Sequence, residues 1–228
     1  YGFATTGQTI VNVPDGKIIR LYVDDEPFYL PTANLLSFER TLNMKFGTLD
    51  RGLLCETPAG KRVSIKSRRL VSFQHRHVAA ISYEVTVLNA GAPVVISSEM
   101  IVEQPDVIDQ ATYGDPRRAK GFRDRVLVCT VNTVRDRRIV LGYTTTNSKM
   151  RLGCGIEHAF DTECPHAYET KCSEDSGKVV FSIDAKPGLP IHLTKYIAYH
   201  TSRRSPPEEL CERTERTLDR AVMTRLSA

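Results

Sequence analysis

Hydrophobic and polar residues alternate with a period of two along most of the chain. The run 79–87 shows this most clearly, because Ser82, Glu84 and Thr86 stand between apolar odd-numbered positions. Successive side chains of a strand point to opposite faces, so such a run predicts a strand with one buried and one wetter face. One-sided burial favours antiparallel sheets. By the same reasoning we assign these positions to the core: Val63, Ile65, Val71, Phe73, Val94, Ile96, Met100, Met150, Leu152, Cys154, Ile156, Val179, Phe181, Ile183, Ile191, Leu193, Ile197 and Tyr199.

Clusters of turn-forming residues separate the predicted strands. Residues 24–27 (Asp-Asp-Glu-Pro) follow a first strand at 18–23, and residues 57–60 (Thr-Pro-Ala-Gly) predict a short hairpin connection. We expect hairpin connections at 89–93 and 173–177 as well. The spacing predicts about a dozen strands.

A longer polar stretch at 104–124 contains two prolines and two glycines, Pro105, Gly114, Pro116 and Gly121. We interpret it as a surface loop between two sheets of one sandwich, with a domain junction as the alternative. The predicted fold over residues 1–204 is therefore a mainly β, antiparallel super-β-sandwich of two large packed sheets.

The period changes to that of a helix at the C-terminus. Ser205 at the N-cap, Pro206 at the first helical position and Glu208 at the third predict a capping box. One face of the predicted helix 207–226 is apolar, and its residues are Leu210, Thr214, Leu218, Ala221, Val222 and Leu226. No Gly or Pro follows this helix, so we expect residues 205–228 to begin a linker and the natural chain to continue. We further expect the apolar face to lack a partner within this chain.

Composition narrows the class of protein. The 228 residues include 31 Lys and Arg against 27 Asp and Glu, a net charge of +4 that is spread along the chain. So small an excess does not favour nucleic-acid binding. No apolar run approaches the ~20 residues that span a bilayer, and no leader peptide is visible. The chain begins at Tyr1 rather than Met, which suggests a trimmed piece of something longer.

Six cysteines stand far apart without a CxxC pair, at Cys55, Cys129, Cys154, Cys164, Cys172 and Cys211. We expect free thiols in a reducing compartment, and hence a cytoplasmic protein. Cys164 and His166 followed by Cys172 come nearest to a zinc motif, but the spacing fits known ligand sets poorly. We interpret that segment as a polar loop.

His75 and His77 are two apart and would lie about 7 Å apart on one face of a strand, where both imidazoles could address one ligand. Two histidines leave a zinc site incomplete, so we favour a polar turn. A basic cluster, Lys66, Arg68, Arg69 and Arg76, could contact phosphate or an acidic segment; the wet face of a strand explains it as well.

A glycosidase needs two carboxylates that face each other across a sugar. Asp24, Asp25, Glu26, Glu56, Glu99, Glu103 and Asp161 supply carboxylates without a recognisable pair. Phosphate-binding glycine loops and the nucleophile elbow are absent from the sequence. We therefore predict no catalytic residue, no cofactor-binding residue and no metal ligand.

Four stretches stand out as a set, at residues 20–28, 35–44, 60–77 and 79–85. Together they resemble the N-terminal domain of glycoside hydrolase family 65, which includes maltose, trehalose and kojibiose phosphorylases; Gly114 to Arg117 and Lys120-Gly121 are compatible with it. The resemblance covers nearly the whole chain and is strongest over residues 17–88.

The resemblance implies an N-terminal super-β-sandwich, a helical linker, an (α/α)6 catalytic barrel and a small C-terminal sheet. The general acid and the phosphate-binding residues would lie in the barrel, outside this chain. The implied partners are the barrel, an α-linked disaccharide and inorganic phosphate for the parent enzyme, and a second copy in a homodimer; we expect no nucleic-acid or membrane partner. Phosphorolysis and hydrolysis both stay open for the parent. The alternative function is a stand-alone carbohydrate-binding β-sandwich, which the absence of Trp disfavours.

Overall fold

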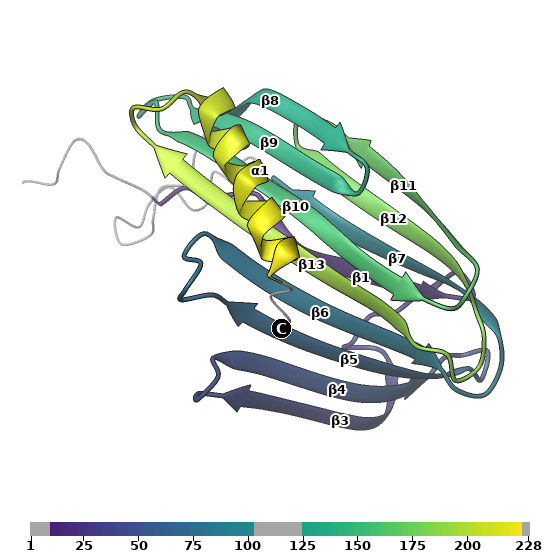
Figure 1. Cartoon of the computed structure of the whole chain (residues 1–228). Coiled ribbons are helices and arrows are strands. Elements are labelled where there is room, and N and C mark those ends of the chain that lie inside the picture. Colours follow the sequence, from purple (N-terminus) through teal and green to yellow (C-terminus); the bar gives the residue numbers. More distant parts are fainter. Residues whose placement is uncertain (1–9, 103–124, 225–228) are drawn as a thin grey trace, which may run out of the picture.

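Two antiparallel sheets face each other, and one helix lies on the outside of the larger sheet (Figure 1). This computed structural model describes residues 10–102 and 125–224. Sheet A has the order β11 (His166–Cys172), β12 (Ser176–Ala185), β7 (Ala92–Ile101), β1 (Asp15–Val23) and β2 (Glu26–Pro27). Sheet B has the order β3 (Asn34–Asn43), β4 (Thr48–Glu56), β5 (Arg62–Val71), β6 (Val78–Val87), β13 (Ile191–Ser202), β10 (Arg151–Thr162), β9 (Arg138–Thr145) and β8 (Leu127–Arg135). The predicted sandwich is confirmed.

The core lies between the two sheets and is built from the alternating apolar positions. Val85 of sheet B and Ile96 and Phe181 of sheet A are each fully buried. Two predicted core positions are wrong, because Val71 is 70% and Phe73 94% exposed. Val71 has the inward parity of β5, but sheet A does not cover that end of the strand.

Most of the predicted turns are confirmed. Asp24 and Asp25 have φ values of 52° and 63° and form the two-residue turn between β1 and β2. Residues 57–60 and 173–177 join strands that pair with each other. The hairpin at 89–93 is wrong, because β6 lies in sheet B and β7 in sheet A, so this connection crosses the sandwich. Turn residues signal a sharp reversal, and they do not determine which sheet receives the next strand.

Helix α1 (Pro207–Met223) lies across β9, β10 and β13 on the outer face of sheet B (Figure 1). Its apolar face is covered: Leu210 is fully buried, and Leu218 is fully buried in one cluster with Ala80 and Ala198 of sheet B. The expected lack of a partner for this face is therefore wrong. Small residues on sheet B let the helix backbone approach closely.

The capping box is also wrong by one residue. The N-cap is Pro206, without a side-chain cap. Ser205 stays in the turn after β13, where its N–H donates to Ser202 Oγ at 3.0 Å and its hydroxyl accepts a bond from Arg213 at 3.4 Å. Residues 104–124 and Leu226, for which we predict a loop and a helical position, lie outside the described residues. The division of the chain at residue 205 stays a prediction.

Gly153 of β10 provides a test of the helix–sheet contact. A Cβ atom at this position would lie 2.6 Å from the carbonyl carbon of Leu210 in α1, whereas one at Gly52 of β4 would have no neighbour within 4 Å. We predict that Gly153→Ala lowers the free energy of unfolding by about 1–3 kcal/mol, the usual cost of overpacking, because the obstructing atoms are backbone. Urea denaturation measures the change. Gly52→Ala is the control, and an equal effect of the two substitutions would contradict the tight contact.

Candidate functional site

A histidine and a serine form a hydrogen-bonded pair between the sheets. His158 Nε2 in β10 lies 2.7 Å from Ser98 Oγ in β7, and His158 Nδ1 lies 2.7 Å from the carbonyl oxygen of Arg137. Since that carbonyl only accepts, Nδ1 carries the proton and Nε2 accepts from the serine hydroxyl. The pair has the connectivity of a nucleophile and its base. Ser98 is fully buried and His158 is 3% exposed, however, so the pair joins the sheets and cannot meet a substrate.

A buried lysine makes a second connection between the sheets. Lys195 of β13 is fully buried, and its ammonium group donates to the carbonyl oxygens of Ile18 at 3.1 Å and Glu99 at 2.7 Å. Burial lowers the pKa of Lys195 to about 7, and the negative charges of Asp15 and Glu99 act in the opposite direction. A buried ammonium group that donates hydrogen bonds to backbone carbonyls has a structural role, because buried polar groups need hydrogen-bond partners. Lys195 therefore links β13 to sheet A.

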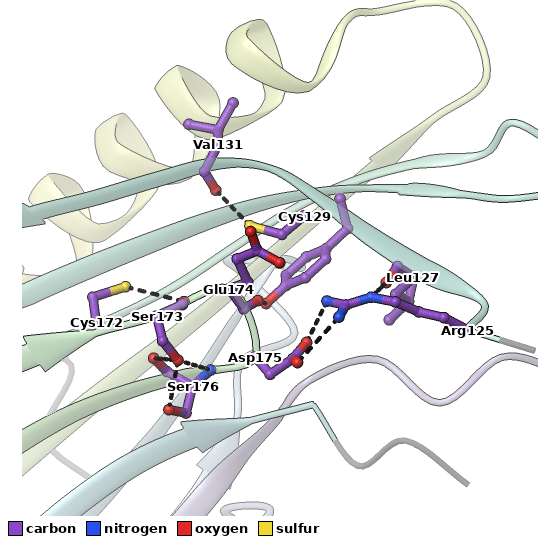
Figure 2. A network of polar contacts seen from close by, with 10 residues as sticks. Arg125, Leu127, Cys129, Val131, Cys172, Ser173, Glu174, Asp175 and Ser176 are labelled. Carbon is purple, nitrogen blue, oxygen red and sulfur yellow. Dashed lines mark hydrogen bonds and ion pairs between the residues drawn. The ribbon is translucent and has the colours of Figure 1, made fainter.

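The edges of the two sheets are joined by an ion pair, shown in Figure 2. Arg125, just before β8, makes a two-pronged contact to Asp175 in the β11–β12 turn, and its Nε donates to the carbonyl oxygen of Leu127 at 2.8 Å. The hydroxyl of Tyr143 in β9 donates to the carbonyl oxygen of Glu174 in the same turn at 2.8 Å. Fork-shaped arginine–carboxylate contacts fix geometry well, so this network holds β8 and β9 against sheet A.

The histidine and cysteine candidates do not form a metal site. Among the described residues, no group of three or more His, Cys, Asp or Glu side chains is placed to hold an ion. His77 stacks on His200 at 4.0 Å between ring centroids, rather than meeting His75. Cys164 precedes β11 and Cys172 ends it. The two thiols therefore lie at opposite ends of an extended strand, which rises about 3.3 Å per residue. All six cysteines are free.

The basic cluster is divided among three places. Lys66 and Arg68 lie on the outer face of sheet B, Arg69 on the inner face, and Arg76 in the turn before β6. Consecutive side chains of a strand point to opposite faces of the sheet, so Arg68 and Arg69 lie on different faces.

An outer groove of about 350 Å³ crosses β3 to β6. Two ion pairs line it: Arg68 binds Asp50, and Lys66 Nζ lies 2.9 Å from Glu84 Oε1. The hydrogen bond from Arg68 holds the pKa of Asp50 below its usual value. Paired, exposed charges of this kind contribute little stability.

A second cavity, of about 380 Å³, opens where β1 and β2 meet β3 and β4. We call it the end pocket; its walls include Phe28 and Tyr29 together with Glu26 and Glu56. Glu56 is bound to Arg62 at 3.1 Å, and Glu26 Oε2 is buried without a hydrogen-bond partner in the described chain. An oxygen without accessible surface cannot reach a glycosidic bond, so these two carboxylates lack the arrangement of a glycosidase pair.

The remaining carboxylate candidates have other positions. Asp24 and Asp25 form the β1–β2 turn, while Glu99 is 4% exposed and binds Arg20 at 3.2 Å on the outer face of sheet A. Asp161 lies near the end of β10. Glu103 lies outside the described residues.

Sequence reasoning missed a surface on the inner face of sheet B. Arg40 of β3 stands directly opposite Arg51 of β4, and Arg69 of β5 lies on the same face. A signal was present, since the turn residues around Gly47 (φ 66°) set the register that pairs position 40 with position 51. We call this surface the arginine face, and it consists of Phe38, Arg40, Leu42, Arg51, Arg69 and Val71.

The buried imidazole of His158 predicts a loss of stability in acid. Burial lowers the pKa of His158 to about 3, with the charge of Lys195 acting in the same direction. The unfolded chain binds a proton near pH 6.5, so the stabilisation is fully present above that pH and is lost as pH falls toward 3. Burial likewise lowers the pKa of His200 to about 4. Between pH 6.5 and 4.5 we predict that His158→Gln reduces the slope of unfolding free energy by up to ~1.4 kcal/mol per pH unit.

Urea denaturation at several pH values measures this slope. Ser98→Ala is the matched control: it removes the hydrogen bond to Nε2 but keeps the buried imidazole, so it lowers stability without changing the slope. A wild-type slope retained in His158→Gln would contradict the assignment.

The described residues include no helix with the length and apolar character needed to cross a bilayer.

The chain is similar over residues 1–228 to the N-terminal domain of glycosyl hydrolase family 65. It is 37% identical over 210 residues to an uncharacterized glycosyl hydrolase of Mycobacterium tuberculosis, a match that covers 91% of this chain and 26% of the relative. It is 32% identical over 203 residues to an alpha,alpha-trehalose phosphorylase of Thermoanaerobacter brockii, covering 89% of this chain and 26% of the relative.

A solved structure from the human microbiome, which carries the provisional name kojibiose phosphorylase, has the same fold. Its TM-score is 0.75 at 13% identity, over 92% of this chain and 26% of that chain. The chain thus spans about a quarter of the length of these relatives. Fold, sequence and coverage agree, and the chain belongs to the N-terminal domain of glycosyl hydrolase family 65.

Proposed function

We propose that this chain is the non-catalytic N-terminal domain of a longer cytoplasmic enzyme that cleaves α-glucosidic disaccharides, and that it supports the catalytic barrel and the assembly of that enzyme. The observation that carries the proposal is coverage: the match takes in 91% of this chain and 26% of a glycosyl hydrolase relative. A domain that occupies a quarter of an enzyme leaves room for a catalytic domain in the remainder.

The chemistry of the described side chains supports a structural role. His158, Ser98 and Lys195, the groups best suited to acid–base or nucleophilic work, are buried between the sheets and satisfied by internal hydrogen bonds. In the outer groove, Lys66 is paired with Glu84 and Arg68 with Asp50. A catalytic acid and base must reach the substrate, and each must have a proton donor or acceptor atom available to it.

Two of the relatives matched are an alpha,alpha-trehalose phosphorylase and a kojibiose phosphorylase. By this similarity the substrates of the full-length protein are an α-linked glucose disaccharide and inorganic phosphate. Phosphorolysis transfers the glucosyl group to phosphate and yields glucose 1-phosphate and glucose. Hydrolysis uses water as the acceptor and yields two glucose molecules. Either choice would be made by residues outside this chain.

We predict that the full-length protein releases glucose 1-phosphate or glucose from trehalose, kojibiose or maltose, and that residues 1–228 alone release neither. The reason is that the carboxylates of residues 10–102 and 125–224 include no accessible pair in a catalytic arrangement. Enzymatic assay of both products, with and without phosphate, makes the measurement. Turnover by the 228-residue chain would overturn the proposal.

Carbohydrate binding is the second candidate, and the end pocket is the observation that favours it. Its wall is mostly apolar and includes Glu26 and Tyr29, which is 63% exposed. Pockets of this composition suit ligands with an apolar face and hydroxyl donors. Calorimetric titration with maltose, trehalose and glucose decides between the two roles. Saturable binding at millimolar or lower concentration that Tyr29→Ala abolishes would establish the second function; the scaffold proposal expects no binding.

A further inference from the structure

The arginine face carries three positive charges that the described chain leaves unpaired. Arg40 and Arg51 are directly opposite each other in the β3–β4 register, and Arg69 is displaced by two positions on β5. Opposed residues in a sheet have Cβ atoms about 5 Å apart, and like charges so placed are destabilising. In the described chain, no hydrogen bond or ion pair joins these guanidinium groups to another side chain.

The charges of Arg40 and Arg51 act on Arg69. Burial lowers the pKa of Arg69, and the charges of Arg51 and Arg40 lower it further, while Tyr83 and Asp15 act in the opposite direction. Asp15 is itself bound to Lys17 at 2.8 Å. The described carboxylate that acts on Arg69 is therefore paired with a different cation.

Exposed apolar side chains surround these arginines. Phe38 and Leu42 lie on either side of Arg40 along β3 and are 49% and 63% exposed, and Val71 beyond Arg69 is 70% exposed. Strand β3 is the free edge of sheet B, at the bottom of Figure 1. Nearly every one of its residues is exposed. Arginines among aromatic and aliphatic side chains are typical of the centre of a protein–protein interface.

The outer face of the same strands behaves differently. There Arg68 has Asp50 and Lys66 has Glu84 as cross-strand partners. Two cross-strand ion pairs thus form on the outer face, whereas the three arginines of the arginine face have none among the described residues. This contrast indicates that the negative charge for the arginine face comes from outside the described chain.

We propose that the arginine face docks the part of the full-length protein that lies outside residues 1–228, through carboxylates set among apolar side chains. The inference rests on the proposed function in one respect, that the chain is a domain of a longer protein, as its coverage of 26% of its relatives supports. A symmetric contact between two copies would place the arginine face of one against that of the other. Three arginines would then oppose three arginines, so a second copy is a poor occupant.

The test is Arg51→Glu in the full-length protein and in the chain of residues 1–228. Within the chain, the new carboxylate faces Arg40 and replaces repulsion by attraction, so the urea midpoint of the 228-residue chain should stay unchanged or rise. In the full-length protein the same carboxylate would face the partner's carboxylates. We expect limited proteolysis to separate the domain from the remainder at least about tenfold faster. The reason is that loss of a buried interfacial charge pair weakens the contact by at least this factor.

Two further variants sharpen the result. Arg135→Glu, an exposed arginine in β8 at the opposite edge of sheet B, is the control and should leave the proteolysis rate unchanged. Arg40→Glu, on the exposed edge strand, repeats the test if Arg51→Glu fails to fold.

An unchanged proteolysis rate in both arginine-face variants would overturn the proposal. Equal destabilisation of the short and full-length chains would overturn it too, because the role would then be internal to the domain. Dissociation of a full-length oligomer with the rate unchanged would overturn it in favour of a second copy. None of these measurements uses catalytic activity. The docking proposal can therefore be overturned while the disaccharide assay supports the proposed function, and it can hold while that assay contradicts the proposed function.

Discussion

The difference in width between the two sheets is the constraint on which this structure depends. Sheet B has eight strands and sheet A five, so the smaller sheet cannot cover the whole inner face of the larger one. Where they overlap, the apolar positions of both sheets bury one another and form the core. Where they do not, the inward side chains of β3 and Val71 at the end of β5 stay exposed, and Arg51 and Arg69 are half-buried. The same alternating pattern therefore produces a core at one end of sheet B and an open surface at the other.

The polar groups between the sheets fix their relative position. His158 with Ser98, and Lys195 with the carbonyl groups of Ile18 and Glu99, each join a strand of sheet B to sheet A. Helix α1 then closes the outer face over β9, β10 and β13, which buries these central strands on both sides. This buried centre contrasts with the exposed edge at β3, and the contrast suits a domain that holds its own shape while offering one surface to a neighbour.

The sequence predicted the architecture well, because one-sided burial leaves a period-two pattern that can be counted directly. It failed where the answer depended on contacts distant in the chain. Val71 has the parity of a core residue, and only the missing cover by sheet A exposes it. The arginine face requires the register of β3 with β4, and the His158–Ser98 pair joins residues 60 positions apart. The apolar face of the helix was predicted correctly for Leu210, Thr214, Leu218 and Ala221, but its partner, the small-residue surface of sheet B, is formed by three strands together.

Solvent access to β3 in the full-length protein tests the central claim most directly. Hydroxyl-radical footprinting with mass spectrometry measures it at Phe38 and Leu42, and Tyr168, 47% exposed on sheet A, serves as the internal reference. If the remainder of the enzyme covers this surface, Phe38 and Leu42 will be oxidised far more slowly in the full-length protein than in the 228-residue chain, while Tyr168 reacts alike in both. Equal oxidation of Phe38 and Leu42 in the two proteins would contradict the account.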